Sequence, residues 1–492
     1  MTGIAARIAA WAANLRYEDV PARVLDRARL QSASVLGAVL AGASSELATR
    51  VRRAANRWGS GDQATLIPGG ERVSTHTACY VNAAASVAFD YDDYLFAGHT
   101  GHSAVLGALA YGEATGASGR DVLAAQVVGN EVGGRLGAAF LLGPHNGQMW
   151  TYIHALEGAC VAGRLIGLDE TEMQHAIGIA LAQPPYPLSP AFFGPDSKAL
   201  MVSSPFVEGV RAAELAAEGL TGADDIIGDE NGMLRKIAAQ PLSFVFSGFG
   251  SAWVTDSLAY KLYPGCAYVD TPVDGLEEIR ETFAGKHGRP LAADDVARIR
   301  VEGTMFTAGM EAMATPYRSR ERLTPVDVNF SVGLSYGVML TLGEISPATL
   351  AADVLAANRD AILSVYDRVT VEQDPELTMQ VGGLTDLGID AAQIFSGGEG
   401  LTLDGADFAA FQMRFPARVM LETTTGEEYA AEVSIPAGAP GRPYEETERA
   451  VRDKFLRGAA GVIGDPEGAL EATLNLDAAP DVHAAIALLT GR

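Results

Sequence analysis

Three aspartates and two histidines lie close together between residues 90 and 102. Asp90, Asp92 and Asp93 follow the apolar segment VNAAASVAF, and His99 and His102 belong to the glycine-rich stretch GHTGHS. Histidine carries protons near neutral pH, and a carboxylate bonded to the far ring nitrogen fixes its tautomer. A pair formed by Asp90 and His99 would supply a general base or acid. The alternative is an aspartate-rich turn beside polar loop histidines.

The position of these acids conflicts with the helix that precedes them. If that helix continues, Asp90 and Asp93 share one face and Asp92 points elsewhere. The C-terminal end of a helix is the negative end of its dipole and disfavours carboxylates. Local conflicts of this kind tend to mark functional sites.

Two further features carry ionisable side chains into apolar surroundings. Lys198, in FFGPDSKALM, is a lone lysine in a stretch with few charges. It is either an ammonium aimed at a carboxylate or oxyanion, or a lysine whose stem lies along the surface. His154 and Glu157 lie three residues apart on an apolar helix. A functional pair is possible there, but we interpret His154 as a hydrogen-bonded core histidine.

Composition limits the function classes. The 492 residues are 48% hydrophobic and 20% charged, enough for two or three domains with large cores. The net charge of −25 and the absence of a basic run argue against nucleic acid as a partner. Cys79, Cys160 and Cys266 form no metal or disulfide pattern, which fits a reducing cytoplasm. No apolar run is long enough for a membrane span.

The pattern of apolar and polar residues along the chain predicts two kinds of structure. Helical periodicity dominates residues 1–265, and alanine and glycine on the apolar faces favour close packing of helices. Strand-like alternation and a hairpin around Thr425 and Gly426 appear within residues 266–437, together with a further helix. The sequence therefore predicts a large all-helical domain and a smaller α/β domain, with residues 438–492 packing back onto the first.

The segment NAAASVAFDYDDYLFAGHTGHSAVLGALAYGEATGASGRDVLAAQVVGNEVGGRLG, residues 82–137, resembles the signature of the MmgE/PrpD family. The family pattern has a DfDD motif, an HPG histidine and a GyEv..Rig helix. Five further stretches agree with the family in order: 15–42, 163–183, 197–222, 257–266 and 442–455.

This resemblance implies a helical domain and an α/β lid domain, with the active site between them. It implies dehydratases, decarboxylases or epimerases that act next to carboxylates of small molecules, use no cofactor or metal, and pair into homodimers. Asp90 matches the first aspartate of DfDD, His99 matches the HPG histidine, and Lys198 matches the lysine before the GveAA helix. The spacing between Asp90 and His99 is one residue shorter than in the decarboxylases.

Several positions depart from the family pattern. Tyr94 replaces the threonine of DfDDT, a family histidine falls at Gln148, and another falls at Asp270. The family tyrosine of FSxxY falls at Leu334, with Tyr336 two residues further on. Gln148 and Asp270 remove positive potential that a tricarboxylate needs, so we expect a substrate with fewer carboxylates.

The leading hypothesis is a cofactor-independent lyase or isomerase that removes a proton next to a carboxylate or carbonyl. His99, oriented by Asp90, is the expected base or acid, and Lys198 the expected stabiliser of the enolate charge. Tyr94 or His102 is the candidate second proton donor. Residues expected to contact the substrate are Tyr94, His102, Gln148, Asp270 and Tyr336.

Two alternatives remain open. In the first, Asp90, Asp93 and His99 hold a metal ion in a metal-dependent lyase. In the second, the protein is a non-catalytic relative that binds a small molecule. The sequence does not separate dehydration, decarboxylation and epimerisation.

Overall fold

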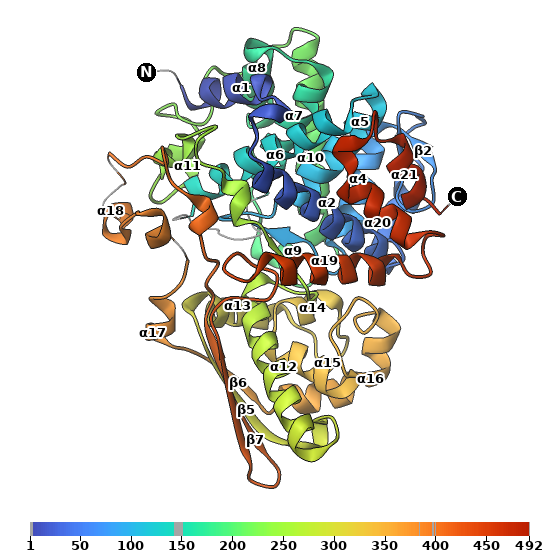
Figure 1. Cartoon of the computed structure of the whole chain (residues 1–492), viewed down its shortest axis with the longest axis vertical. Coiled ribbons are helices and arrows are strands. Elements are labelled where there is room, and N and C mark those ends of the chain that lie inside the picture. Colours follow the sequence, from blue (N-terminus) through green and yellow to red (C-terminus); the bar gives the residue numbers. More distant parts are fainter. Residues whose placement is uncertain (1–2, 142–150, 383, 396–397, 399, 492) are drawn as a thin grey trace.

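The computed structural model describes residues 3–141, 151–382, 384–395, 398 and 400–491. Two bodies are stacked along the long axis of the molecule (Figure 1). The upper body is helical and combines the N-terminal half of the chain with its C-terminal end. The lower body contains a four-stranded sheet covered by helices. The prediction of a mainly helical fold with a small mixed sheet is confirmed.

The upper body is a compact bundle whose helices approach each other through glycines. On α10 (Ser197–Ala217), a Cβ atom at Gly209 would lie 2.1 Å from the carbonyl oxygen of Ala155 on α7 (Tyr152–Ile166). The small residues noted in the sequence therefore allow close helix contact. The other long helices of this body are α1 (Ile4–Asn14), α2 (Ala22–Gly42), α3 (Glu46–Ala55), α4 (Thr75–Val87), α5 (Gly101–Thr115), α6 (Gly119–Ala139) and α8 (Glu170–Ala180).

The C-terminal helices return to this bundle. They are α19 (Tyr444–Ala459), α20 (Pro466–Leu474) and α21 (His483–Leu489), drawn in red in Figure 1. On α2, a Cβ atom at Gly37 would lie 3.0 Å from the Cα atom of Phe455, so α19 and α2 are in backbone contact. The end of the chain is thus part of the helical core.

The lower body is built on a sheet with the strand order β6-β5-β7-β8. Strand β5 (Val296–Gly303) pairs in parallel with β6 (Val369–Gln373) and antiparallel with β7 (Ala417–Thr423), which forms a hairpin with β8 (Glu428–Val433). Gly426 in the hairpin turn has φ 83°, as the predicted turn requires. The helices described in this body are α12 (Ala267–His287), α13 (Met305–Ala314), α14 (Pro325–Asn329), α15 (Val332–Leu342), α16 (Ala352–Tyr366) and the short α17 (Pro375–Thr378).

One segment within the range predicted for the lid belongs to the helical core. Leu387, Ile394, Phe408 and Phe411 are buried in the same hydrophobic cluster as α1 and α2. The proposed division at residues 266 and 437 therefore needs this exception.

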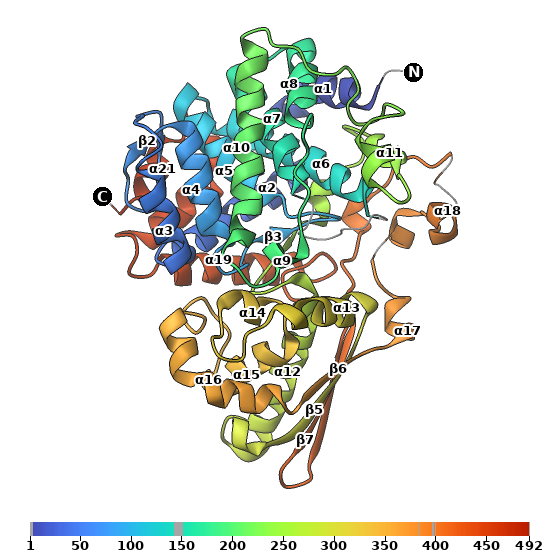
Figure 2. The same ribbon diagram turned by 180° about the vertical axis from the view of Figure 1, so that it is seen from behind.

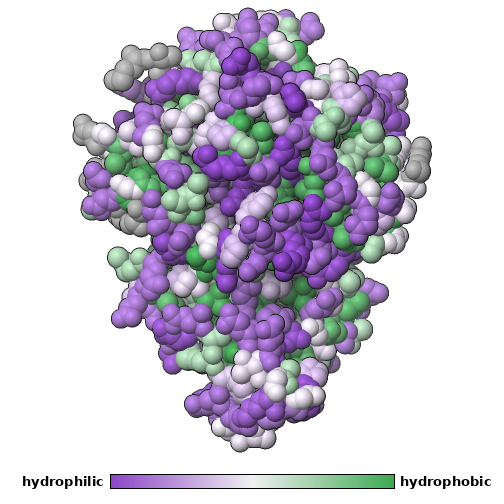
Figure 3. Space-filling view, viewed as in Figure 1, coloured by the Kyte–Doolittle hydropathy of each residue, from purple (hydrophilic) through white to green (hydrophobic). Residues whose placement is uncertain are grey.

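A short pair of strands ties distant parts of the helical body together. Strand β3 (Asp93–Tyr94), labelled at the lower edge of the helical body in Figure 2, pairs with β4 (Ala259–Tyr260), and Asp93 lies opposite Tyr260. The hydrophilic residues on the face shown in Figure 3 are spread over both bodies, with hydrophobic residues scattered among them. Within the described residues, we find no helix with the length and apolar character that crossing a membrane requires.

Candidate active site

The acidic motif lies beyond the end of its helix, not on a continuation of it. Helix α4 ends at Val87, and Asp90 has φ 55°, a left-handed conformation that aspartate tolerates better than most residues. The helix does not continue, so the condition under which Asp90 and Asp93 would share a helical face is not met. The chain turns at Asp90 and enters β3, and all three aspartates are fully buried.

Lys261 joins two of these aspartates. Its Nζ atom lies 2.6 Å from Oδ1 of Asp90 and 2.9 Å from Oδ1 of Asp92. Burial disfavours its charged form, but the two carboxylates outweigh burial and raise the pKa of Lys261 above its ordinary value. The sequence prediction missed this residue, although it is the one charged position in the stretch SLAYKLYPGC.

The same ion pairs keep the aspartates ionised. Burial favours protonation of Asp90, but the ammonium groups of Lys198 and Lys261 outweigh it and lower the pKa of Asp90. Burial is likewise outweighed at Asp92, where Lys261 and the histidines hold the pKa well below its ordinary value. Both side chains therefore act as hydrogen-bond acceptors at neutral pH.

His99 is held by Asp92, not by Asp90 as we expected. Its Nδ1 atom lies 2.8 Å from Oδ2 of Asp92. Because Asp92 is ionised, Nδ1 must carry the proton, and the lone pair of the neutral ring is then on Nε2. Burial is the largest influence on His99 and lowers its pKa, so the neutral, basic form prevails at neutral pH.

His102 supports Asp92 from the other side. Its Nε2 atom lies 3.0 Å from Oδ2 of Asp92, and its Nδ1 atom lies 2.7 Å from Oγ of Ser86. Both ring nitrogens of His102 thus contact protein groups, and the contact with Asp92 helps to hold that carboxylate in place. The role of His102 as a second proton donor stays a prediction. His154 is buried and hydrogen-bonded to Ser103 at 2.8 Å, as a core histidine should be.

Lys198 lies in the first turn of α10 and points at Asp90. Its Nζ atom lies 3.1 Å from Oδ2 of Asp90 and faces the rings of Phe192 and Phe330, at 5.9 and 5.1 Å from their centroids. The side chain is 4% exposed, so it is not the surface lysine of the alternative interpretation. Aromatic faces favour a cation at such a position.

Asp93 takes part in a separate network. Its Oδ2 atom accepts a hydrogen bond from Nε2 of Gln31 at 2.8 Å. Burial and the neighbouring Asp92 raise the pKa of Asp93 to about 6. The oxygens of Asp90 face the ammonium groups of Lys198 and Lys261. Among the described residues, no three or more His, Cys, Asp or Glu side chains are arranged so that they could hold a metal ion.

The remaining predicted site residues occupy different surroundings. The Tyr94 ring lies 6.1 Å from that of His99, and burial keeps its pKa well above the ordinary value, so the phenol is protonated. Asp270, on α12, is also buried, and burial raises its pKa well above the ordinary value. The hydroxyl of Tyr336 donates to the carbonyl of Pro272 inside the lower body. Gln148 lies outside the described residues.

Asn329 is a further candidate that the sequence prediction missed. Its side chain is 1% exposed, and neither amide atom has a hydrogen-bond partner among the described residues. Its backbone carbonyl accepts from the N–H of Cys266, next to Gly265, whose own N–H donates to the carbonyl of Asp90. A buried amide without partners is unusual and is a natural place for a ligand.

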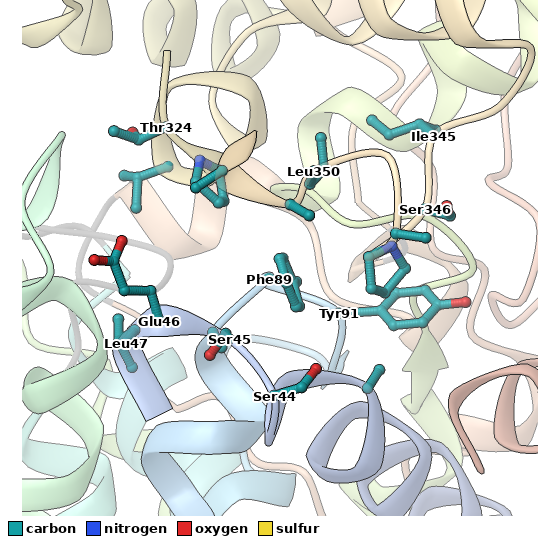
Figure 4. A pocket seen from close by; sticks show the side chains of 18 of the residues that line it. Ser44, Ser45, Glu46, Leu47, Phe89, Tyr91, Thr324, Ile345, Ser346 and Leu350 are labelled. Carbon is teal, nitrogen blue, oxygen red and sulfur yellow. The ribbon is translucent and has the colours of Figure 1, made fainter. Parts of the chain in front are cut away.

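A large pocket of about 1160 Å³ lies between the two bodies, beside this cluster. Phe89 and Tyr91 line it (Figure 4) and alternate along the chain with Asp90 and Asp92. The pocket thus lies against the opposite face of the acidic segment, where Ser45 and Thr324 from the two bodies also contribute. The ionisable cluster itself has little contact with solvent: the side chain of His99 is 9% exposed and that of Asp92 is 0% exposed.

The fold and the buried cluster of aspartate, histidine and lysine define an enzyme-like interior site. Residues 6–244 match the family model of the MmgE/PrpD N-terminal domain, and the chain belongs to the MmgE/PrpD family. The resemblance inferred from the sequence motifs is therefore confirmed.

Three known proteins are similar to this chain. A cis-aconitate decarboxylase of Aspergillus terreus (strain NIH 2624 / FGSC A1156) is 27% identical over 57% of this chain and 61% of its own length. A second cis-aconitate decarboxylase of Aspergillus terreus is 26% identical over 61% of this chain and 64% of its own length. Both matches cover less than two thirds of those proteins. A cis-aconitate decarboxylase-like protein, oryM, of Aspergillus oryzae is 22% identical over 99% of this chain and 97% of its length.

Proposed function

We propose that this protein is a cofactor-independent lyase or isomerase that removes a proton from the carbon next to a carboxylate or carbonyl of a small organic acid. The observation that carries the proposal is the hydrogen bond between His99 Nδ1 and Asp92 Oδ2. It leaves a neutral imidazole whose Nε2 is basic, which is the requirement for a general base near neutral pH.

The neighbouring groups suit the charge that this step creates. Removing the proton places negative charge on an oxygen of the substrate, and the ammonium of Lys198 can stabilise it. Asp270 has a raised pKa, and its neutral carboxyl can donate a hydrogen bond to the same kind of oxygen. Tyr94, protonated and near His99, is our candidate for the second proton donor.

The fate of the carbanion decides the reaction. Return of the proton to the opposite face gives epimerisation, and loss of a protonated hydroxyl from the next carbon gives dehydration. The relatives are cis-aconitate decarboxylases by name. In a decarboxylation the bond to the carboxylate breaks, carbon dioxide leaves the electron pair on the carbon, and a protonated group of the site then delivers a proton to that carbon.

The charge balance argues for a substrate with fewer than three carboxylates. In the described part of the chain, Lys198 and Lys261 are the lysines that form ion pairs with the carboxylates of Asp90 and Asp92. Little positive charge is left to attract a tricarboxylate. We also propose the homodimer that the family resemblance implies, and light scattering of the purified protein would test it.

Proton NMR in D₂O is the direct test. The protein is incubated with EDTA and with a panel of cis-aconitate, citrate, dicarboxylic acids, and hydroxy- and amino-acids. We expect deuterium to enter the carbon next to a carboxylate of one acid, and we expect His99→Asn and Lys198→Met to slow this about 10²-fold or more. His76→Asn, which removes an imidazole paired with Glu214, is the matched control and should exchange at the wild-type rate. Exchange that survives unchanged in His99→Asn would refute the assigned base.

A further inference from the structure

The ammonium group of Lys454 lies inside the protein, directly behind the segments that carry Asp92 and Lys261. Its side chain is 0% exposed. Lys454 belongs to α19 and is 362 residues from Asp92 in the chain. On this helix Lys454 sits beside the buried residues Val451 and Phe455, on the face that packs against α2. A lysine on the apolar face of an amphipathic helix needs a physical reason.

Three hydrogen bonds use the full donor capacity of this ammonium. Its Nζ atom lies 2.8 Å from Oγ of Ser34, 3.1 Å from the carbonyl oxygen of Asp92 and 2.9 Å from the carbonyl oxygen of Lys261. The Lys261 N–H donates to the same Asp92 carbonyl at 3.2 Å. Lys454 therefore binds both main-chain segments whose side chains form the ion pair between Asp92 and Lys261.

Burying the charged amine of Lys454 costs free energy of folding. Burial lowers the pKa of Lys454 to about 7, while the carboxylates of Asp92 and Asp93 act in the opposite direction. The ring of Tyr91 adds a contact, with its centroid 4.2 Å from Nζ. An apolar side chain of similar length would fill this space without the cost of burying an amine.

We propose that Lys454 is a positioning residue of the active site: by binding the carbonyls of Asp92 and Lys261 it fixes their ion pair, and through Asp92 it fixes the orientation and tautomer of His99. The proposal rests on the proposed function, because it gives His99 the role of base. It also makes the C-terminal helix a part of the active site.

The test compares Lys454→Met with Val451→Ala, which removes buried volume from the same helix without touching either carbonyl. Long-range ¹H–¹⁵N NMR reports the tautomer of His99, whose signals are assigned by their loss in His99→Gln. In the wild type we expect the proton on Nδ1. In Lys454→Met we expect a mixture of tautomers and a proton-exchange rate at least 10-fold lower, with KM within about 2-fold. Val451→Ala should keep the wild-type tautomer and a rate within about 2-fold.

Lys454→Arg retains the charge and the donors, so it should retain the wild-type tautomer of His99. If Lys454→Met does not fold, Lys454→Gln is read in the same way, because its shorter side chain cannot reach both carbonyls. A Lys454→Met or Lys454→Gln protein that keeps the wild-type tautomer of His99 and the wild-type exchange rate would overturn the inference. If the wild type exchanges no proton from any acid, the proposed function fails, yet the tautomer of His99 still decides the role of Lys454.

Discussion

The Nδ1 atom of His99 lies 2.8 Å from Oδ2 of Asp92, and this hydrogen bond decides which ring nitrogen can take a proton. Asp92 is itself held by Lys261 at 2.9 Å and by His102 at 3.0 Å. A carboxylate fixed on three sides cannot follow a rotating ring, so the imidazole is pre-oriented before a substrate binds. Asp90, the residue that the motif singles out, holds Lys198 instead.

Asp92→Asn should therefore lower the catalytic rate strongly, because Asp92 acts on the reaction through His99. The amide can still fill the space, but it no longer holds His99 in a defined tautomer, and we expect a loss of about 10²- to 10⁴-fold in kcat. The rate of deuterium incorporation measures this. Asp256→Asn, at a buried carboxylate paired with Arg23, is the control and should leave the rate within a few-fold. A loss below 5-fold in Asp92→Asn would contradict the assigned role.

The pH dependence should follow the neutral form of His99. Burial lowers the pKa of His99 below its ordinary value of 6.5. A general base works when deprotonated, so kcat/KM should rise with pH below that pKa and level off above it. Tyr94 stays protonated well above pH 10 and should add no alkaline limb below it. Initial rates between pH 4.5 and 9 test this, and a rate that falls between pH 5 and 7 would mean that the imidazolium acts as an acid.

Asp93→Asn should stabilise the protein at alkaline pH. Burial and Asp92 raise the pKa of Asp93 from 3.8 to about 6, so the folded state prefers the protonated form. A raised carboxyl pKa means that the folded protein loses stability as the pH rises from about 4 through 6. The difference between a pKa of 3.8 and one of about 6 corresponds to a loss of roughly 3 kcal/mol of folding stability at high pH, and the uncharged asparagine has no such loss.

Urea unfolding at pH 5 and pH 8 measures this difference. The free energy of unfolding of Asp93→Asn, relative to the wild type, should be larger at pH 8. Asp295→Asn is a useful contrast, because the guanidinium of Arg289 lowers the pKa of that partly exposed carboxyl to about 2. That carboxyl is ionised at both pH values, so the relative stability of Asp295→Asn should be the same at pH 5 and pH 8. An Asp93→Asn variant with the same relative stability at both pH values would show that Asp93 is not protonated in the folded state.

Exhaustive chelation should leave the activity unchanged. The metal hypothesis needs Asp90, Asp93 and His99 to share one ion. Asp90 instead contacts the ammonium groups of two lysines, and Asp93 binds Gln31. Ammonium groups occupy the positions where a cation would lie. Deuterium incorporation is measured before and after dialysis against EDTA, and a loss that is restored by added Mg²⁺ or Mn²⁺ would favour the metal-dependent lyase.

Local patterns in the sequence predict the elements well. The helix α6 and the hairpin of β7 and β8 follow from periodicity and from the turn at Gly426. Lys198 could be selected because a lysine in an apolar stretch is rare, and it does contact Asp90. Each of these inferences uses residues that are neighbours in the chain.

The partners of the aspartates could not be predicted, because they depend on contacts between distant segments. Lys261 is 169 residues from Asp92 and 171 residues from Asp90 in the chain, and the pairing of β3 with β4 brings it to both. The chain leaves α4 and turns at Asp90, which has a positive φ. After this turn Asp92, and not Asp90, forms the hydrogen bond with Nδ1 of His99. Lys454 carries a visible signal, a charge beside Val451 and Phe455, but the sequence does not show what it binds.

Asn329→Leu should separate substrate binding from stability. Both amide atoms of Asn329 are buried without a partner in the described part of the chain, so leucine removes a desolvation cost and should stabilise the free protein by about 1 to 2 kcal/mol. If the substrate binds this amide, the same change should raise KM about 10-fold and leave kcat within about 3-fold. Asn358→Leu, at an amide bonded to the carbonyl of Val354, is the control and should leave KM unchanged. A more stable Asn329→Leu protein with the wild-type KM would place the substrate elsewhere, because the amide would then cost stability without contributing to binding.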